Sequence, residues 1–415
     1  MASEKYVNRL VDSYIDELLL DSSAIMMVGP RGCGKTTSAL RRAKTVLRVD
    51  QTGVRNAMKG DPDAVLRDGD PPVLVDEWQL EPSSLGAAKR LVDDNDAPGQ
   101  FIFAGSAGDE VGGRNWPATG RFIRVPMWGL VQRELQNGSL EGTFFDRVAS
   151  PDFEGTFPLP AARPDTSGYL EVALQSGFPR CVTRSSERSR NRWLNSYIDH
   201  LVSRDVELIG EVREPLLFRR YLNAVAANTA GSPDDSTLIQ AVRINRETAS
   251  RYDTFLERLF VAEQVPAWSS NRLTRVSARA KRYICDPAIA AALIGADRRT
   301  ILRDGDLLGR FIDSFVAAQL RPELALGTQP VNMFHLRQDG RREIDIVLER
   351  RDGAVIGIEV KAATAVDPKD ARHLFWLRDQ LSPENYKAGI VFYTGSHVLA
   401  LGDRTWAVPI CALWM

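Results

Sequence analysis

Apolar residues recur at two different spacings in the first third of the chain. Residues 5–20 carry them at helical spacing, and residues 24–29 form a short apolar run that ends in glycine. Four more short apolar runs follow, separated by helical or polar segments, at residues 46–49, 73–76, 101–105 and 122–125. Buried strands that alternate with helices predict an α/β fold with a parallel sheet covered on both faces.

Turn-rich stretches divide the rest of the chain. Residues 126–168 are rich in Gly, Pro, Ser and Asp, which is typical of an irregular connection. Helical spacing returns at residues 187–227, and a second turn-rich stretch follows at 229–236. Because 415 residues are too many for one core, we expect several domains. Their predicted ranges are 1–150, 151–228, 229–300 and 301–415.

Residues 29–36 match the pattern G-x-x-x-x-G-K-[ST] between a predicted strand and a predicted helix. This spacing is typical of a phosphate-binding loop, whose backbone N–H groups surround the β-phosphate. Lys35 would supply charge to the β and γ oxygens, and Thr36 would offer a hydroxyl to Mg²⁺. We therefore expect ATP with Mg²⁺, or Mn²⁺ in its place. The expected nucleotide contacts are Gly29, Pro30, Arg31, Gly32, Cys33, Gly34, Lys35, Thr36 and Thr37.

The apolar run at 73–76 ends in two adjacent carboxylates. Asp76 is expected to hold Mg²⁺ through water, and Glu77 to orient or deprotonate the attacking water. The alternative is two ordinary acidic residues at a strand end. Together with the additional strand predicted at 46–49, the pair predicts a P-loop NTPase of the additional-strand class, and hence an ATPase.

Three further residues are candidates for sensing or stabilising the γ-phosphate. Ser106 ends the strand at 101–105, where it would act either as a sensor of the phosphate or as a polar strand cap. Arg114 and Arg121 follow in glycine-containing loops, and we favour Arg121 as an arginine finger. Such a finger would act in its own subunit or in a neighbouring one, so a homo-oligomer is among the expected partners.

Residues 343–361 contain two alternating strands joined by a short turn. A three-residue loop would pair Arg350 with Ala354 and place Asp345 opposite Glu359. Lys361 would face Glu343 on the same polar side. The opposite face is then wholly apolar, with the pairs Leu348–Ile356, Ile346–Ile358 and Ile344–Val360.

The spacing from Asp345 to Glu359 and Lys361 resembles the D-x(n)-[DE]-x-K core of the restriction-endonuclease-like superfamily. The resemblance implies that the carboxylates bind one or two Mg²⁺ ions and that the lysine orients or activates the hydrolytic water. Asp313, on a predicted upstream helix, would be a third metal ligand, at a position where such folds usually carry Glu. The alternative is a solvated hairpin face with a cross-strand ion pair between Glu343 and Lys361 and without cleavage.

Residues 234–268 have the rhythm of helix, turn, helix and wing that is typical of a winged helix. From Leu238 to Tyr283 there are nine Arg/Lys and four Asp/Glu, a net charge of nine minus four, or +5. Arg243, Arg246 and Arg251 are the expected contacts to DNA or RNA. The alternative is a winged helix that serves as a spacer between domains.

Composition limits the partners. With 53 Lys+Arg against 54 Asp+Glu, the whole chain carries no general attraction for polyanions. Four scattered cysteines favour neither a disulfide framework nor a zinc site. No apolar run approaches the roughly 20 residues that a membrane helix needs. We expect a cytoplasmic protein without a membrane partner.

The order of these parts resembles a prokaryotic family of AAA-type ATP-binding proteins with a C-terminal domain of unknown function, built from a winged helix and a restriction-endonuclease-like fold. The resemblance implies ATP binding and hydrolysis. Departures are Trp78 and Asp313, where the family has an aliphatic residue and Glu. Collinear strings carry the resemblance: VDEWQ (75–79), AGS (104–106), TGRFIRVPMWGLVQREL (119–135), LQSGFPR (174–180), WLNSYIDHLVSRDV (193–206), ETASRYDTFLERL (247–259), YICDPAIAAALIG (283–295) and GRFIDSFVAAQL (309–320).

The leading hypothesis is a Mg²⁺-dependent ATPase whose nucleotide state repositions a basic winged helix and a nuclease-like domain on nucleic acid, in stress or phage defence. The alternative hypothesis is a nucleotide-gated regulatory or binding protein in which the nuclease-like fold no longer cleaves.

Overall fold

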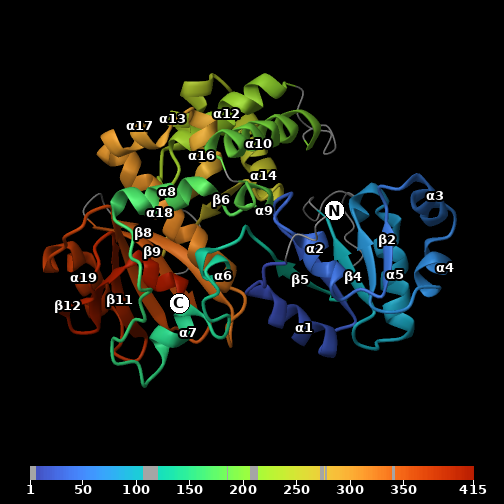
Figure 1. The fold of residues 1–415 in the computed structure, drawn as a ribbon, viewed down its shortest axis with the longest axis horizontal. Helices are drawn as coiled ribbons and strands as arrows, with labels where there is room; N and C mark the ends of the chain where they lie inside the picture. The colour runs from blue at the N-terminus through green and yellow to red at the C-terminus, as the bar shows by residue number, and fades with distance from the viewer. Residues whose placement is uncertain are drawn as a thin grey trace. The chain divides into compact units, whose positions relative to one another are not determined.

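A computed structural model describes residues 6–105, 120–184, 186–205, 214–271, 275, 278–338 and 342–415 (Figure 1). The chain forms two compact units. The N-terminal unit comprises residues 8–129 together with 258–260. The C-terminal unit comprises the other residues that the structure describes, chiefly 130–257 and 261–415.

The N-terminal unit contains a five-stranded sheet in the order β2-β3-β4-β1-β5, and all its strand pairs are parallel. All five predicted strands are present within one residue of the expected bounds. The strands are β1 (Ala24–Val28), β2 (Thr45–Arg48), β3 (Val73–Asp76), β4 (Phe101–Ala104) and β5 (Phe122–Pro126). The helices are α1 (Val11–Asp21), α2 (Lys35–Leu40), α3 (Thr52–Gly60), α4 (Pro62–Arg67) and α5 (Ser83–Asp94).

The strand order confirms a parallel P-loop sheet and corrects one detail of the prediction. The strand that lies between β1 and β3 is β4, which follows both of them in sequence. The predicted additional strand at 46–49 corresponds to β2, which lies at the edge of the sheet. Every residue of β1, β3 and β4 is buried, because these central strands have neighbours on both sides and helices over the sheet.

The C-terminal unit begins with helices and a small hairpin. A layer of helices leads into α12–α14, which precede the two-stranded antiparallel sheet β6–β7. The helices are α6 (Gln132–Leu135), α7 (Phe144–Ala149), α8 (Thr166–Gln175), α9 (Pro179–Val182), α10 (Glu187–His200), α12 (Pro215–Ala227), α13 (Asp235–Val242), α14 (Arg246–Arg258), α16 (Pro287–Ile294) and α17 (Arg298–Arg303). The strands are β6 (Ala262–Val265) and β7 (Lys281–Ile284).

The last part of this unit is a six-stranded mixed sheet in the order β12-β13-β11-β10-β9-β8. One face packs on α18 through Ile312 and Phe315, and the other packs on α19 through Leu374 and Leu377. The elements are α18 (Gly305–Leu320), β8 (Val331–Gln338), β9 (Arg342–Arg350), β10 (Val355–Lys361), α19 (Arg372–Gln380), β11 (Tyr386–Tyr393), β12 (Leu399–Gly402) and β13 (Thr405–Pro409).

The β9–β10 hairpin has the predicted register from the turn as far as the pair Ile346–Ile358. The ladder ends there, so the predicted pairs of Asp345 with Glu359 and of Ile344 with Val360 are not part of it. Leu348 lies opposite Ile356, and the amide of Arg350 donates to the carbonyl oxygen of Ala354 over 2.9 Å. Gly353 closes the turn with a φ of +89°, a conformation that glycine adopts without strain.

The predicted apolar face of this hairpin is wrong at one position. Ile346 packs in the cluster on the α18 side, whereas Ile344 packs with Val347 in the cluster on the α19 side. Two residues that share a face of a regular strand here lie on opposite faces. The alternation therefore breaks at Asp345, which separates them.

The predicted boundary at residue 150 is also wrong, because residues 130–150 belong to the C-terminal unit. Arg133, which is 1% exposed, pairs with buried Glu323 over 2.9 Å. Phe144 of α7 packs against Phe392 of β11. Residues 410–414 extend this core, where the amide of Cys411 donates to the hydroxyl of Tyr169 on α8. These partners are too distant in sequence for a local pattern to have shown them.

Among the helices that the structure describes, none combines the length and apolarity needed to cross a membrane.

Candidate functional site

The phosphate-binding loop lies between β1 and α2, as its pattern predicts. Lys35 is 7% exposed, and its Nζ donates to the carbonyl oxygens of Gly29 and Pro30 over 2.7 and 2.9 Å. Gly29 has a φ of +148°, and a Cβ there would lie 1.9 Å from the carbonyl oxygen of Met127. Only glycine therefore fits at this position of the loop.

Arg9 supports the same loop from the start of the chain. This buried side chain donates to the carbonyl oxygen of Cys33 over 3.0 Å and to those of Trp128 and Gly129 over 2.8 and 3.3 Å. It thus joins the loop to the segment that follows β5. No pattern in the sequence indicates this role for Arg9, because its partners are main-chain carbonyl oxygens.

Cys33 is fully buried in the loop, and its Sγ donates to the carbonyl oxygen of Met127 over 3.4 Å. It fills space between the loop and the segment after β5.

The two predicted halves of the Mg²⁺ site are in contact. The hydroxyl of Thr36 donates to Oδ1 of Asp76 over 2.8 Å, which joins the start of α2 to the end of β3. Burial raises the pKa of the Asp76 carboxyl, and the hydrogen bond from Thr36 opposes this rise. A hydroxyl and a carboxylate at this distance are oxygen donors of the kind that Mg²⁺ prefers. The donor set therefore fits the predicted cation.

Glu77 follows Asp76 in a left-handed conformation, with a φ of +56°. Its amide donates to the carbonyl oxygen of Ala104 over 2.8 Å, and its carboxylate accepts a hydrogen bond from Gln79. This conformation is unfavourable for a residue with a Cβ, and such strain is found most often at functional sites. The hydrogen bond to β4 thus fixes the backbone of Glu77, and the hydrogen bond from Gln79 orients its carboxylate.

Arg121 lies at the other end of the sheet from the loop. Residues 24–28 run alongside 122–126, so the length of a five-residue strand, roughly 16 Å, separates Arg121 from the loop. Its Nε donates to Asp93 of α5 over 2.7 Å. Within one subunit Arg121 does not approach the predicted phosphates. Ser106 and Arg114 lie outside the described residues.

The predicted nuclease-like residues come together around an unexpected lysine. Lys281 of β7 is 3% exposed, and its Nζ lies 2.5 Å from Oδ2 of Asp313 and 3.2 Å from Oδ1 of Asp345. From its sequence position Lys281 is expected only to contribute to the basic segment 238–283. Its two partners follow it by 32 and 64 residues, so no local motif connects them.

Glu359 and Lys361 form the other side of this cluster. Lys361 Nζ lies 3.0 Å from Oε2 of Glu359, and His373 Nδ1 lies 3.7 Å from Oε1. Burial raises the pKa of the Glu359 carboxyl. Lys361 therefore pairs along its own strand, instead of across the hairpin with Glu343 as the solvated-face alternative predicts.

Among described residues, no group of three or more His, Cys, Asp or Glu side chains is arranged to hold a metal ion.

Internal ion pairs account for much of the basic charge between residues 238 and 283. Among the described residues of this segment, several basic side chains pair with carboxylates of the same unit: Arg275 with Glu349, Arg279 with Asp234, Lys281 with Asp313 and Asp345, and Arg282 with Asp235 and Asp253. Arg243, which follows α13, and Arg246 and Arg251 of α14 are exposed. The positive charge that this segment offers to a partner is therefore smaller than the net +5 of the sequence and is concentrated at these exposed arginines.

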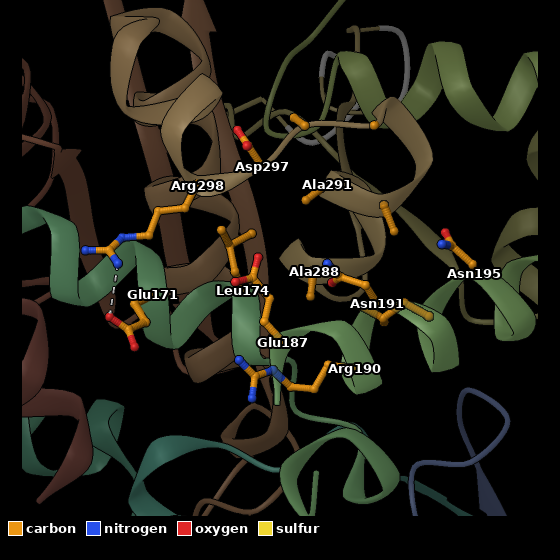
Figure 2. A pocket seen from close by; sticks show the side chains of 14 residues that line it. Glu171, Leu174, Glu187, Arg190, Asn191, Asn195, Ala288, Ala291, Asp297 and Arg298 are labelled. Carbon is orange, nitrogen blue, oxygen red and sulfur yellow. Dashed lines mark ion pairs between the residues drawn. The ribbon is translucent and has the colours of Figure 1, made fainter. Parts of the chain in front are cut away.

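A pocket of about 290 Å³ lies among α8, α10, α16 and α17 (Figure 2). Alanines such as Ala288 and Ala291 line one side, and Glu187 and Arg190 of α10 line another. At its edge Arg298 pairs with Glu171 over 3.4 Å. No residue predicted from the sequence lines this pocket, because its walls come from four separate helices.

Family models match three successive parts of the chain. An AAA domain matches residues 21–136, a domain of unknown function (DUF8612) matches residues 166–300, and a second domain of unknown function (DUF4143) matches residues 308–413. The N-terminal part of the chain is thus similar to an AAA domain, and the parts that follow are similar to domains of unknown function.

Two mycobacterial proteins are similar to nearly the whole chain. They are uncharacterized protein Rv2008c of Mycobacterium tuberculosis and uncharacterized protein Mb2031c of Mycobacterium bovis, each 25% identical over 390 residues. The alignments cover 93% of this chain and 79% of each relative. A solved structure, the Walker-type ATPase PABY2304 of Pyrococcus abyssi, is 14% identical with a TM-score of 0.43, over 70% of this chain and 97% of that one.

Proposed function

We propose that this protein is a Mg²⁺-dependent ATPase whose nucleotide state controls how its C-terminal unit engages DNA or RNA. The observation that carries the proposal is the hydrogen bond between Thr36 and Asp76, which joins the phosphate-binding loop to the carboxylate pair at the end of β3. The AAA match over residues 21–136 supports the same assignment.

Each residue of the N-terminal site has a distinct role in this proposal. Lys35 binds the ground-state phosphates, and Thr36 and Asp76 hold Mg²⁺. The cation, when bound, neutralises charge on the phosphates. Glu77 orients or deprotonates the attacking water. It is adjacent to Asp76 in sequence, so one carboxylate acts on the water while its neighbour holds the cation.

Arg121 acts between subunits if it acts as a finger, because strand length separates it from the loop of its own subunit. Such a role requires a homo-oligomer.

Nucleic acid would contact the segment made of the helices α12, α13 and α14 and the β6–β7 hairpin. This order of elements supports a winged helix, and exposed Arg243, Arg246 and Arg251 supply positive charge for phosphate contacts. The order α18-β8-β9-β10-α19-β11 supports a restriction-endonuclease-like fold for the last segment.

Phosphate release from Mg²⁺-ATP tests the ATPase. Lys35→Ala should abolish nucleotide binding, whereas Glu77→Gln should retain binding and lose turnover. Glu81→Gln is a matched control from the same segment, since its carboxylate only accepts a hydrogen bond from Ser83 among the contacts described, and it should keep wild-type turnover. Wild-type turnover in both Lys35→Ala and Glu77→Gln would disprove the site.

A further inference from the structure

The Lys281 cluster lies where β7, α18 and β9 meet in the C-terminal unit. The resemblance to nuclease-like folds implies a divalent cation beside Asp345 and the acidic residue of the preceding helix. Here a lysine from a different strand lies between these two carboxylates and also donates to the main-chain oxygen of Asp345 over 3.2 Å. The positive charge at this position therefore belongs to the chain itself.

Electrostatics favour a charged lysine at this position. Burial disfavours the Lys281 ammonium, but Asp313, Tyr283 and Asp345 outweigh it and hold the pKa of Lys281 well above its ordinary value. Burial likewise disfavours the Asp345 carboxylate, but Lys281 and the Val360 amide outweigh it and lower the pKa of Asp345. Burial raises the pKa of Asp313 to about 7 against the opposing effect of Lys281, so Lys281 and Asp345 are the firmly charged members of the cluster. Removing the lysine would leave the Asp345 carboxylate buried without compensation.

The carboxylate oxygens of the cluster are already used. Oδ1 of Asp313 accepts from the Tyr283 hydroxyl over 2.9 Å, and Oδ2 accepts from Lys281. Oδ1 of Asp345 accepts from Lys281, and Oδ2 accepts from the Val360 amide over 2.9 Å.

The third carboxylate leaves one oxygen for a cation. Oε2 of Glu359 accepts from Lys361, and Oε1 is buried without a hydrogen-bond partner among the residues described. Mg²⁺ requires near-octahedral oxygen ligation, and one remaining oxygen, on a carboxylate paired with Lys361 and 3.7 Å from Nδ1 of His373, does not supply it. The side chains present therefore do not fit the cation that the resemblance implies.

We propose that Lys281 permanently replaces the divalent cation between Asp313 and Asp345, so that the C-terminal carboxylates bind no metal and cleave no phosphodiester. The cluster instead ties the β6–β7 hairpin to β9 and α18, which couples the helical segment to the six-stranded sheet. This inference does not depend on the ATPase. It favours a C-terminal unit that regulates or binds rather than cuts.

Manganese binding tests the proposal directly. The experiment uses the full chain with Lys35→Ala and no nucleotide, so that the phosphate-binding loop does not recruit the ion. Electron paramagnetic resonance of free Mn²⁺ should show no ion bound at the cluster, and Asp345→Asn should bind the same amount of Mn²⁺ as the parent. One Mn²⁺ per chain that Asp345→Asn removes would overturn the proposal, while leaving the ATPase assignment unaffected.

Removing the lysine should create the metal site that the wild type lacks. Lys281→Ala in the same background should lower the melting temperature by about 10 °C, because a buried charge pair is broken. Millimolar MnCl₂ should restore part of this loss and should leave the parent unchanged. Lys361→Ala is the matched control: its side chain is 34% exposed and it pairs with Glu359, so it should show a smaller loss and no response to MnCl₂.

If Lys281→Ala does not fold, the Mn²⁺ titrations of the parent and of Asp345→Asn still decide the question, because both proteins keep the lysine. A Lys281→Ala protein that melts like the parent and takes up no Mn²⁺ would show that the lysine holds no essential position, and would overturn the proposal.

Discussion

Replacing Arg9 with methionine should weaken ATP binding, although no part of the nucleotide motif contains this residue. Its guanidinium holds Cys33 of the phosphate-binding loop and Trp128 through hydrogen bonds of 3.0 and 2.8 Å. A hydrogen bond from a charged group contributes about 1.5–3 kcal/mol. Two such bonds at the lower end give about 3 kcal/mol, or roughly 100-fold in affinity if the loop must be ordered to bind nucleotide.

The assay is a fluorescence titration with a mant-labelled ATP, together with a thermal melt of each variant. Arg42→Met is the matched control, because Arg42 bonds Asp16 and joins α1 to α2 without contacting the loop carbonyls that Arg9 holds. It should lose stability and keep its affinity for nucleotide. An Arg9→Met protein that binds the labelled ATP as tightly as wild type would refute the reasoning.

Three other expectations address the finger, the basic helix and pH. Arg121→Ala should lower turnover and keep binding, and mixing it with Glu77→Gln protein should restore activity if the finger acts between subunits; unchanged turnover in the single variant would remove the role. Charge reversal at Arg246 and Arg251 should reduce the salt dependence of polynucleotide binding, measured by fluorescence anisotropy, by about one unit of slope per lost phosphate contact. Identical titrations would indicate that the winged helix is only a spacer between domains. Burial lowers the pKa of His335 from 6.5 to about 4, so its contribution to stability is present above pH 6.5 and is lost as pH falls towards 4, by about 3 kcal/mol in total. Urea unfolding should show a smaller loss of stability between these pH values for His335→Gln than for wild type, and equal losses would contradict the assignment.

Local patterns predict the N-terminal sheet well. Its strands are short, apolar and separated by turns, and the glycines of the loop are required by close backbone approach, as Gly29 shows. The hairpin register is predictable near the turn for the same reason, since the turn around Gly353 fixes which residues face each other as far as Ile346 and Ile358.

Contacts between distant segments are not predictable in this way. The charge of Lys281 suggests a nucleic-acid surface until its partners are known, and these lie 32 and 64 residues further along the chain. Arg133 is similar, because its pairing with Glu323 spans 190 residues and decides which unit residues 130–150 join. A single sequence contains no periodicity that reports such pairs, so the position of a boundary and the identity of the buried cation both require the fold.

The packing of residues 410–414 against α7 and α8 has a consequence for synthesis. The N-terminal unit draws almost all its residues from 8–129, so most of it can assemble early on the ribosome. The hydroxyl of Tyr169, by contrast, accepts a hydrogen bond from the amide of Cys411, which is synthesised 242 residues later. During that interval the parts of α7 and α8 that pack on residues 410–414 stay uncovered, which makes them natural binding sites for chaperones. Shortening the chain by its last residues should therefore reduce the yield of folded protein before it changes any catalytic constant.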